Sequence, residues 1–255
     1  MSNLGASVGW GAVIAASLVI GGLVAAAVSL PERVAATITA FGGGTLLSAI
    51  ALELVPEADA EAGVVLTALG LLGGTVLYVG ADAWLNRNEE RRLARRSMHA
   101  AASGRGLGMS VDQAEATRGE SIAVGLFVDG VPESIAVGLT IAEGEVGVAL
   151  LAGVLIGNLV ESYGAAQPIV ASGRTRRFAV TLLIAIGCAL AFATVLGGTV
   201  LADASAELVG TAQAVAAGAV LAVVSIAVIP HAFEEVSSLV ATATVAGFVV
   251  GYVLS

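Results

Sequence analysis

The chain has 255 residues, of which 57% are hydrophobic and only 12% charged, and its mean hydropathy is +0.96. Soluble domains have roughly 45–50% apolar and about 25% charged residues, so the composition excludes an ordinary soluble domain and favours a polytopic membrane protein. All 11 basic residues are arginines, and the 20 acidic residues give a formal net charge of −9, which argues against nucleic-acid binding.

Apolar runs of about 20 residues predict eight membrane-spanning helices. We expect them at residues 8–30, 34–55, 63–85, 120–141, 145–172, 178–201, 208–230 and 234–254. The first run has no basic segment before it, so we interpret it as a retained helix rather than a cleaved signal peptide. The whole chain is therefore predicted to form a single transmembrane domain, and its one long connection is residues 86–119.

The arginines predict how the chain is oriented in the membrane. In the eight-span scheme every arginine falls in the first, third or fifth connection, and the second, fourth and sixth connections hold acidic residues and no basic ones. Positively charged loops stay on the cytoplasmic side. We therefore expect a multi-pass protein of the cell membrane, with residues 86–119 in the cytoplasm and both termini outside. The arginine-rich connection is interpreted as orientation-setting, with docking to anionic lipid as the alternative.

The predicted fourth span carries two carboxylates within a strongly apolar segment. Asp129 and Glu133 are four residues apart and would share one face of a helix, with Pro132 between them. Because proline has no amide hydrogen, the carbonyl oxygen of Val128 would lose its helical donor. A carboxylate inside a membrane costs about 2.5–3.5 kcal/mol on insertion scales, so such groups are functional by default. We interpret this face as a cation site; the alternatives are proton carriage and a structural polar contact between helices.

A similar motif occurs in the predicted fifth span. Glu161-Ser162 repeats the Glu133-Ser134 of the fourth span, and Asn158 lies one turn before Glu161 on the same face. Both motifs fall at a similar depth in the membrane. We therefore expect the two spans to face each other and to bring their oxygen ligands together. For Asn158, a hydrogen bond between helices is an equally supported alternative.

A second internal similarity links the second and seventh spans. Glu53-Leu-Val-Pro56, near the outer end of one, resembles Ala227-Val-Ile-Pro230, near the inner end of the other. An inverted repeat requires opposite ends, so we expect three spans, two central spans and three mirrored spans. Glu53 and His231 are weaker metal-ligand candidates near the two membrane surfaces. A helix-end acid and an interfacial histidine are their respective alternatives.

With these motifs, the chain resembles the ZIP family of divalent-metal transporters. The segment Asp129-Gly-Val-Pro-Glu-Ser is similar to the family's His-Asn-x-Pro-Glu-Gly motif, and Gly157-Asn-x-x-Glu161 is similar to its fifth-span metal motif. External termini and a long cytoplasmic loop after the third span also match. The resemblance implies eight helices in a 3+2+3 inverted repeat, transport of a divalent cation toward the cytoplasm, metal ligands on the two central spans, and pairing as a homodimer.

The sequence departs from the family where histidines are common. Asp129 stands in place of the usual histidine, Gly157 replaces histidine or glutamine, and the sixth span has no glutamate. The remaining ligands are all oxygen donors: Asp129, Glu133, Asn158 and Glu161. Such donors suit Mg²⁺, Mn²⁺ and Ca²⁺, whereas Zn²⁺ prefers nitrogen or sulfur. We expect a ZIP-like transporter of a Zn, Mn or Fe class cation with a reduced site, in which the cation is the substrate and no resident cofactor is needed.

Two other classes of function are kept beside transport. The missing histidines favour, as the main alternative, a degenerate ZIP scaffold that binds or regulates without transporting. An intramembrane aspartyl protease would use Asp82 and Asp129 of neighbouring spans, but the first is predicted at the membrane edge and the second near its middle. We therefore do not expect an enzyme. The expected partners are a divalent metal ion, membrane lipid and a second copy of the chain.

Overall fold

The computed structural model describes residues 3–28, 31–102, 111–144, 146–171, 175–200, 204–236 and 238–255. Within these ranges, side chains are described except at residues 26, 32, 85–102, 111–125, 167–168, 171, 227, 231 and 234–236. The described part of the chain is built of helices, without a strand, which confirms the prediction of an all-α protein.

The helices follow one another with short connections. The first half of the chain forms α1 (Asn3–Ala27), α2 (Glu32–Ala49), a π-helical turn η1 (Ile50–Leu54), α3 (Val55–Ala102) and α4 (Val111–Glu143). The second half forms α5 (Val148–Ala171), α6 (Arg176–Val200), α7 (Ala206–Val223), a second π-helical turn η2 (Val224–Val228), α8 (Ile229–Val236) and α9 (Ser238–Leu254). Every predicted span overlaps at least one of these helices.

Helix boundaries differ from the prediction in two places. The second predicted span continues through η1 into α3, and the chain turns only at Gly63, whose φ of 77° and ψ of 159° interrupt the helix. Glycine suits this turn because it lacks the Cβ that disfavours positive φ. Residues 86–119, predicted as a connection, are largely helical, because α3 continues to Ala102 and α4 begins at Val111. Arginine and glutamate are good helix formers, so these polar segments can extend the apolar helices.

Several helices are long and apolar enough to cross a membrane. Among the described residues, five stretches meet both conditions: Asn3–Ala25, Arg33–Trp84, Val148–Ala166, Arg176–Val200 and Ala206–Ile226. The second stretch is 52 residues long and includes Gly63, so it covers both the second and the third predicted span. Ser238–Leu254 is also apolar but shorter, at 17 residues. These helices are compatible with a membrane protein.

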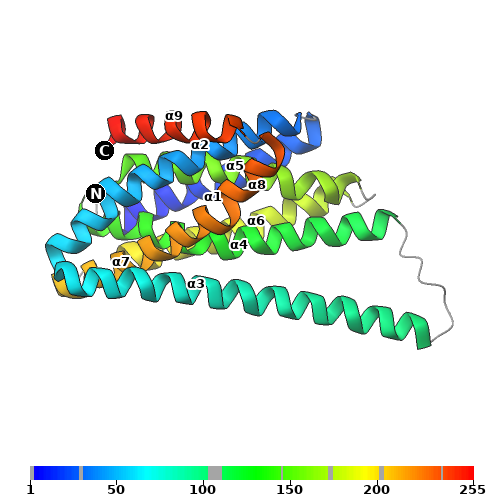
Figure 1. Cartoon of the computed structure of the whole chain (residues 1–255), viewed down its shortest axis with the longest axis horizontal. Helices are drawn as coiled ribbons and strands as arrows, with labels where there is room; N and C mark the ends of the chain where they lie inside the picture. The colour runs from blue at the N-terminus through cyan, green and yellow to red at the C-terminus, as the bar shows by residue number, and fades with distance from the viewer. Residues whose placement is uncertain are drawn as a thin grey trace.

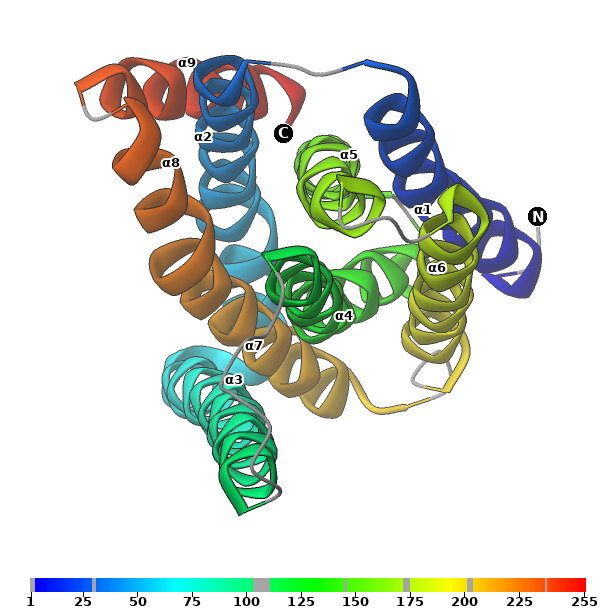
Figure 2. The same cartoon turned by 90° about the vertical axis from the view of Figure 1, so that its right-hand side faces the viewer.

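The helices lie side by side in one bundle, with α4 and α5 in its middle (Figures 1 and 2). Seen end-on, α1 and α6 flank this central pair on one side, and α2, α7, α8 and α9 lie on the other, with α3 packed against α7 (Figure 2). Buried leucines such as Leu18, Leu139, Leu150 and Leu190 fill the core around the pair. Polar groups on α4 and α5 can therefore be shielded from both water and lipid.

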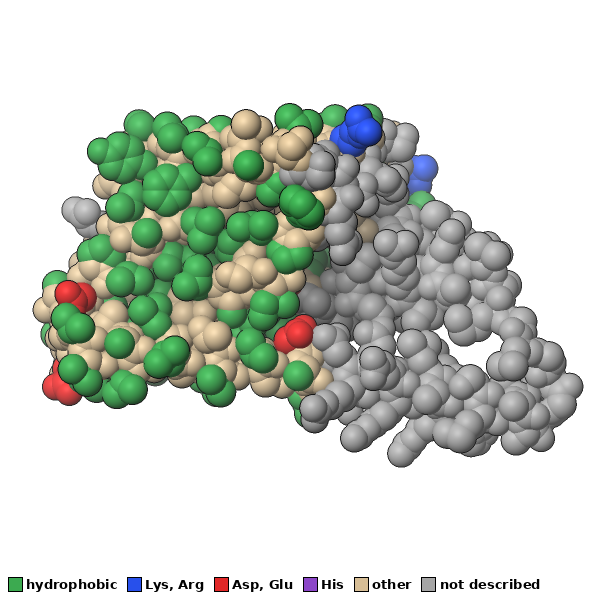
Figure 3. All heavy atoms as spheres, in the orientation of Figure 1, with side chains coloured by type: hydrophobic (Ala, Val, Ile, Leu, Met, Phe, Trp, Pro, Cys, Tyr) green, Lys and Arg blue, Asp and Glu red, His purple; other side chains and the backbone are tan. Residues whose placement is uncertain are grey.

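Both ends of the chain lie at one end of the bundle, which we call the termini end (Figure 1). Acidic side chains are visible at the termini end and also near the grey residues at the lower middle of the view, whereas arginines are visible only toward the opposite end (Figure 3). The surface between them is mainly apolar. The arginines whose side chains are described begin helices at that opposite end: Arg33 in α2, and Arg176 and Arg177 in α6. An apolar band between two charged ends is the surface that a bilayer requires.

The two π-helical turns occupy equivalent places relative to a proline. η1 ends two residues before Pro56, and η2 ends two residues before Pro230. The amide that follows each turn reaches the carbonyl five residues earlier, that of Ile50 in η1 and of Val224 in η2. Proline cannot donate to the carbonyl four residues before it, and its ring crowds that carbonyl. One widened turn accommodates the ring without ending the helix.

Glycines allow α3 and α7 to touch through their backbones. Gly74 faces the carbonyl oxygen of Val215, Gly218 faces that of Leu71, and a Cβ on either glycine would overlap with the oxygen that it faces. A Cβ on Gly73, the neighbour of Gly74, would have no atom of another part of the chain within 4 Å. Such small-residue contacts are typical of helix packing in membranes.

We expect Gly74→Ala to destabilise the protein and Gly73→Ala to leave it unchanged or slightly more stable. The first substitution pushes α3 away from α7 and should cost about 1–3 kcal/mol, as overpacking does in protein cores. The second adds about 0.5–1 kcal/mol of helix propensity and meets no neighbour. Unfolding by SDS in mixed micelles, followed by circular dichroism, measures both variants. Equal midpoints for the two would contradict the α3–α7 contact.

Candidate metal centre

Helix α4 places Asp129 and Glu133 inside the bundle. The predicted four-residue spacing is kept within one helix that contains Pro132. Glu133 is 5% exposed and Ser134 is fully buried, whereas Asp129 is partly exposed. A carboxylate as buried as that of Glu133 needs a cation, a proton or several hydrogen-bond donors beside it.

Helix α5 supplies Asn158 and Glu161. Asn158 is 1% exposed, and within the described chain neither its Oδ1 nor its Nδ2 has a hydrogen-bond partner. Its main-chain oxygen accepts a hydrogen bond from Ser162 Oγ at 2.5 Å. Helix α1 covers this segment closely, because a Cβ on Gly21 would overlap with the Ser162 hydroxyl and the Leu159 carbonyl. Leaving a buried amide without partners costs about 1–3 kcal/mol, so a ligand that coordinates Asn158 would be favoured.

The carboxylates of the two helices lie close enough to repel one another. The negative charges of Asp129, Glu133 and Glu161 repel one another in all three pairs. The sequence has no arginine from residue 119 to residue 173. Away from water, three neighbouring carboxylates cannot all be ionised unless a cation or protons compensate them. The charges of these three side chains therefore interact across the α4–α5 contact, and Asn158 lies one turn from Glu161.

The sequence analysis missed Tyr78 of α3. This side chain is 4% exposed, and its hydroxyl donates a hydrogen bond to Asp129 Oδ1 at 2.6 Å. Hydrogen bonds to ionised acceptors are short and strong, so this contact ties α3 to α4. The sequence feature that could have pointed to Tyr78 is a tyrosine within an apolar span. A buried phenol hydroxyl needs a polar hydrogen-bond partner.

The candidate ligands do not converge on one point in this arrangement. Among the described residues, no three His, Cys, Asp or Glu side chains are grouped closely enough to hold a metal ion together. The Oδ1 of Asp129 accepts a hydrogen bond from Tyr78 of α3. The candidate ligands for a cation are therefore Glu133, Asn158 and Glu161, together with an Asp129 carboxylate that is shared with Tyr78.

Glu53 lies elsewhere, at the first turn of α5. It belongs to η1, and its Oε1 accepts a hydrogen bond from the amide of Ala149 at 3.4 Å, with the amide of Leu150 also facing it. A Cβ on Gly147 would stand 2.6 Å from Glu53 Oε2, so glycine there makes room for the carboxylate. Free amides and the helix dipole favour a negative charge at a helix N-terminus. These contacts are those of an acid at a helix end, while Glu53 Oε2 is buried without a hydrogen-bond partner in the described chain, so the metal-ligand role of Glu53 stays a prediction.

The histidine candidate is placed only in part. His231 falls in α8, and its side chain lies outside the described residues. The role predicted for His231 therefore stays a prediction. Asp82 lies one turn after Tyr78, and its charge acts on Asp129.

Comparison with known proteins adds no family name to these observations. No protein-family model matches the chain, and no curated protein matches it. A functional conclusion must therefore be drawn from the α4–α5 contact, from the two π-helical turns and from the sequence motifs that they contain.

Proposed function

We propose that this chain is a ZIP-like membrane transporter that moves a divalent metal cation of the Zn, Mn or Fe class toward the cytoplasm. The observation that carries the proposal is the α4–α5 contact, where buried Glu133, unpartnered Asn158 and Glu161 lie near one another, with no arginine from residue 119 to residue 173. Two carboxylates and an amide oxygen are a donor set for divalent cations. The cation is the substrate, which the site must bind and then release.

An oxygen-only donor set suits a cation that must leave again. Zn²⁺ binds most tightly to nitrogen and sulfur, so carboxylates in place of histidine weaken its retention and broaden selectivity toward Mn²⁺ and Fe²⁺. Tyr78 adds a competitor, because its hydroxyl and the cation bind the same carboxylate of Asp129. We therefore propose that Asp129 exchanges Tyr78 for the cation during binding and returns to Tyr78 on release.

The proposal includes the eight-span 3+2+3 inverted repeat. Three observations support it: the overlap of the predicted spans with helices, the equivalent π-helical turns before Pro56 and Pro230, and the central position of α4 and α5. The separation of acidic and arginine-bearing ends supports a cell-membrane orientation with both termini outside.

Cysteine labelling tests this orientation in cells. In a Cys188→Ala background, Ser255→Cys at the termini end should react with a membrane-impermeant maleimide in intact cells. Thr175→Cys, at an exposed position just before α6, should react only after permeabilisation. Labelling of both positions in intact cells would refute the proposed orientation.

Uptake of radiolabelled Mn²⁺ into proteoliposomes tests transport. The wild-type protein should accumulate the ion above protein-free liposomes, and Glu133→Gln should lose nearly all of this uptake, because it removes a buried charge that the cation needs. Glu207→Gln is the matched control, since it makes the same chemical change at an exposed position in the first turn of α7. Equal uptake by Glu133→Gln and the control would exclude the α4–α5 contact as the transport site.

The main alternative is a ZIP-like scaffold that binds a cation or regulates without transporting. The incomplete convergence of the ligands among the described residues is the observation in its favour. A wild-type protein that binds Mn²⁺ in solution but shows no uptake into proteoliposomes would select this alternative.

A further inference from the structure

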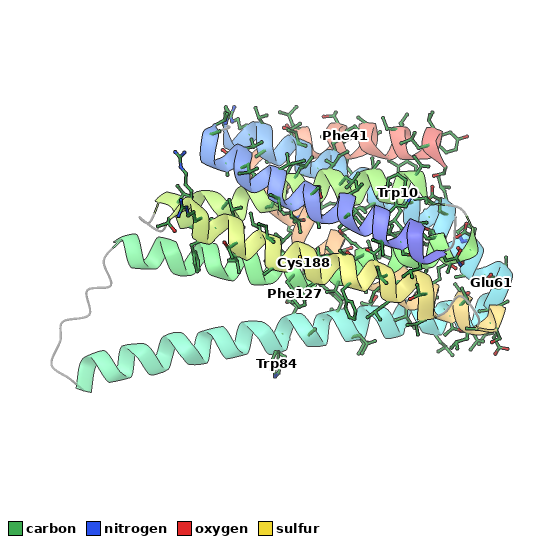
Figure 4. All side chains as sticks on the ribbon, turned by 180° about the vertical axis from the view of Figure 1, so that it is seen from behind. Trp10, Phe41, Glu61, Trp84, Phe127 and Cys188 are labelled. Atoms are coloured by element: carbon green, nitrogen blue, oxygen red, sulfur yellow. The ribbon has the colours of Figure 1, made fainter. Side chains whose placement is uncertain are left out.

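A second group of carboxylates lies at the termini end, about 15 Å along α4 from Glu133. Glu57 and Glu61 lie near the start of α3, Glu143 ends α4, and Gln213 projects from α7; Figure 4 labels Glu61 at this end of the bundle. Gln213 Nε2 donates hydrogen bonds to Glu57 Oε2 at 2.6 Å and to Glu143 Oε2 at 3.2 Å. One amide therefore joins three helices.

Gln213 distinguishes this cluster from a solvated acidic surface. Its side chain is 0% exposed, and its Oε1 has no hydrogen-bond partner in the described chain, although the same amide contacts two carboxylates. Gly210, one turn earlier, lets α7 lie against α3 beside Glu61, because a Cβ there would stand 2.7 Å from Glu61 Cβ. An unpartnered buried oxygen is unfavourable by about 1–3 kcal/mol. A rotated amide would direct this oxygen at a cation held between the carboxylates.

The negative charge of the cluster has no basic partner in the sequence. Arginine is absent from residues 34–86, 119–173 and 178–255. Glu143 as a whole is exposed to solvent, but its carboxyl group contacts Gln213 and Glu57. Burial of that carboxyl, then the charge of Glu57 and a hydrogen bond with it, raise the pKa of Glu143 to about 8. Burial and the charge of Glu57 also raise the pKa of Glu61.

We propose that Glu57, Glu143 and Gln213 form a second binding site, for a hydrated divalent cation, at the termini end of the bundle. No three carboxylates of the described chain converge on one point, so Glu61 contributes charge and water completes the coordination. Two carboxylates, one amide oxygen and water are suitable ligands for Mn²⁺ or Mg²⁺. In the proposed orientation the site faces outside and collects the cation. It binds whether or not the chain transports.

Mn²⁺ binding, counted by the loss of the electron paramagnetic resonance signal of the free ion, tests this second site. The detergent-solubilised full chain is titrated at one fixed pH for all variants. Wild type should bind two ions per chain, and Glu57→Gln/Glu143→Gln should lose one of them and keep the other. The control Asp59→Asn/Glu207→Gln also removes two charges at this end, from exposed positions outside the cluster, and should bind as wild type does.

Further variants keep this test separate from the test of transport. Glu133→Gln/Glu161→Gln should lose the other ion. Binding of two ions by this variant would refute the proposed transport site and would not affect the proposal of a second site. Full binding by Glu57→Gln/Glu143→Gln would overturn the second site. Gln213→Glu tests the same site without removing either carboxylate ligand. A third carboxylate should tighten Mn²⁺ binding there about tenfold, because affinity rises with the charge of the ligands. Unchanged affinity in this variant counts against the proposal.

Discussion

Glutamine in place of either Glu133 or Glu161 is expected to remove most of the affinity for a divalent cation at the α4–α5 contact, and glutamine at both positions is expected to remove little more. Each substitution withdraws one of two negative charges that the buried cation needs. We expect a loss of about 100-fold in Kd for each single variant, which corresponds to roughly 2.7 kcal/mol. The double variant should lie within about 0.5 kcal/mol of the singles, because groups that share one ligand do not contribute additively.

Proton release on metal binding is a second test of whether Glu133 and Glu161 share one cation. Two neighbouring carboxylates in a low dielectric cannot both be ionised without a cation, so metal binding must displace a proton and should weaken as pH falls. Isothermal titration of the wild type in two buffers of different ionisation enthalpy should therefore give different heats. Ser134→Ala, which keeps every charge, is the control and should behave as wild type does. Additive losses together with buffer-independent heats would show that the two glutamates do not share a cation.

The sequence was sufficient to identify the polar groups of α4 and α5. A carboxylate such as Glu133 within an apolar span has few structural reasons to be there, and the matched Glu-Ser dipeptides indicated that the two helices meet. Tyr78 could not be identified in this way. Sequence periodicity gives the face of one helix, but not how that helix is rotated against its neighbour, and the hydrogen bond from Tyr78 to Asp129 depends on that rotation.

The roles of Glu53 and Gln213 also depend on distant parts of the chain. Glu53 caps the start of α5, 96 residues later in the sequence, and Gln213 lies 156 residues from Glu57. The Pro56 and Pro230 motifs were recognised as similar, but the sequence did not show that each follows a π-helical turn. A proline in an apolar run can end, kink or widen a helix, and packing against neighbouring helices decides among these outcomes.

Asp129→His is expected to shift the preference of the site from Mn²⁺ toward Zn²⁺. Imidazole is a softer ligand than carboxylate and favours Zn²⁺, so the ratio of the two dissociation constants should change by about tenfold or more in favour of Zn²⁺. Asp129→Asn is the matched control, because it removes the same charge without supplying an imidazole nitrogen, and it should weaken both metals with little change in their ratio.

The hydrogen bond between Tyr78 and Asp129 provides a second test of whether Asp129 binds the metal. The Tyr78 hydroxyl occupies Asp129 Oδ1, so Tyr78→Phe frees the carboxylate for the cation, whereas a packing change alone would leave metal preference untouched. We expect Tyr78→Phe to strengthen Mn²⁺ binding in the presence of Asp129 and to have no such effect in the Asp129→Asn background. Competition titrations of Zn²⁺ against Mn²⁺ on the wild type, the three single variants and the Tyr78→Phe/Asp129→Asn double variant measure both effects. If Asp129→His leaves the ratio unchanged and Tyr78→Phe acts equally in both backgrounds, then Asp129 is a structural partner of Tyr78 and not a metal ligand.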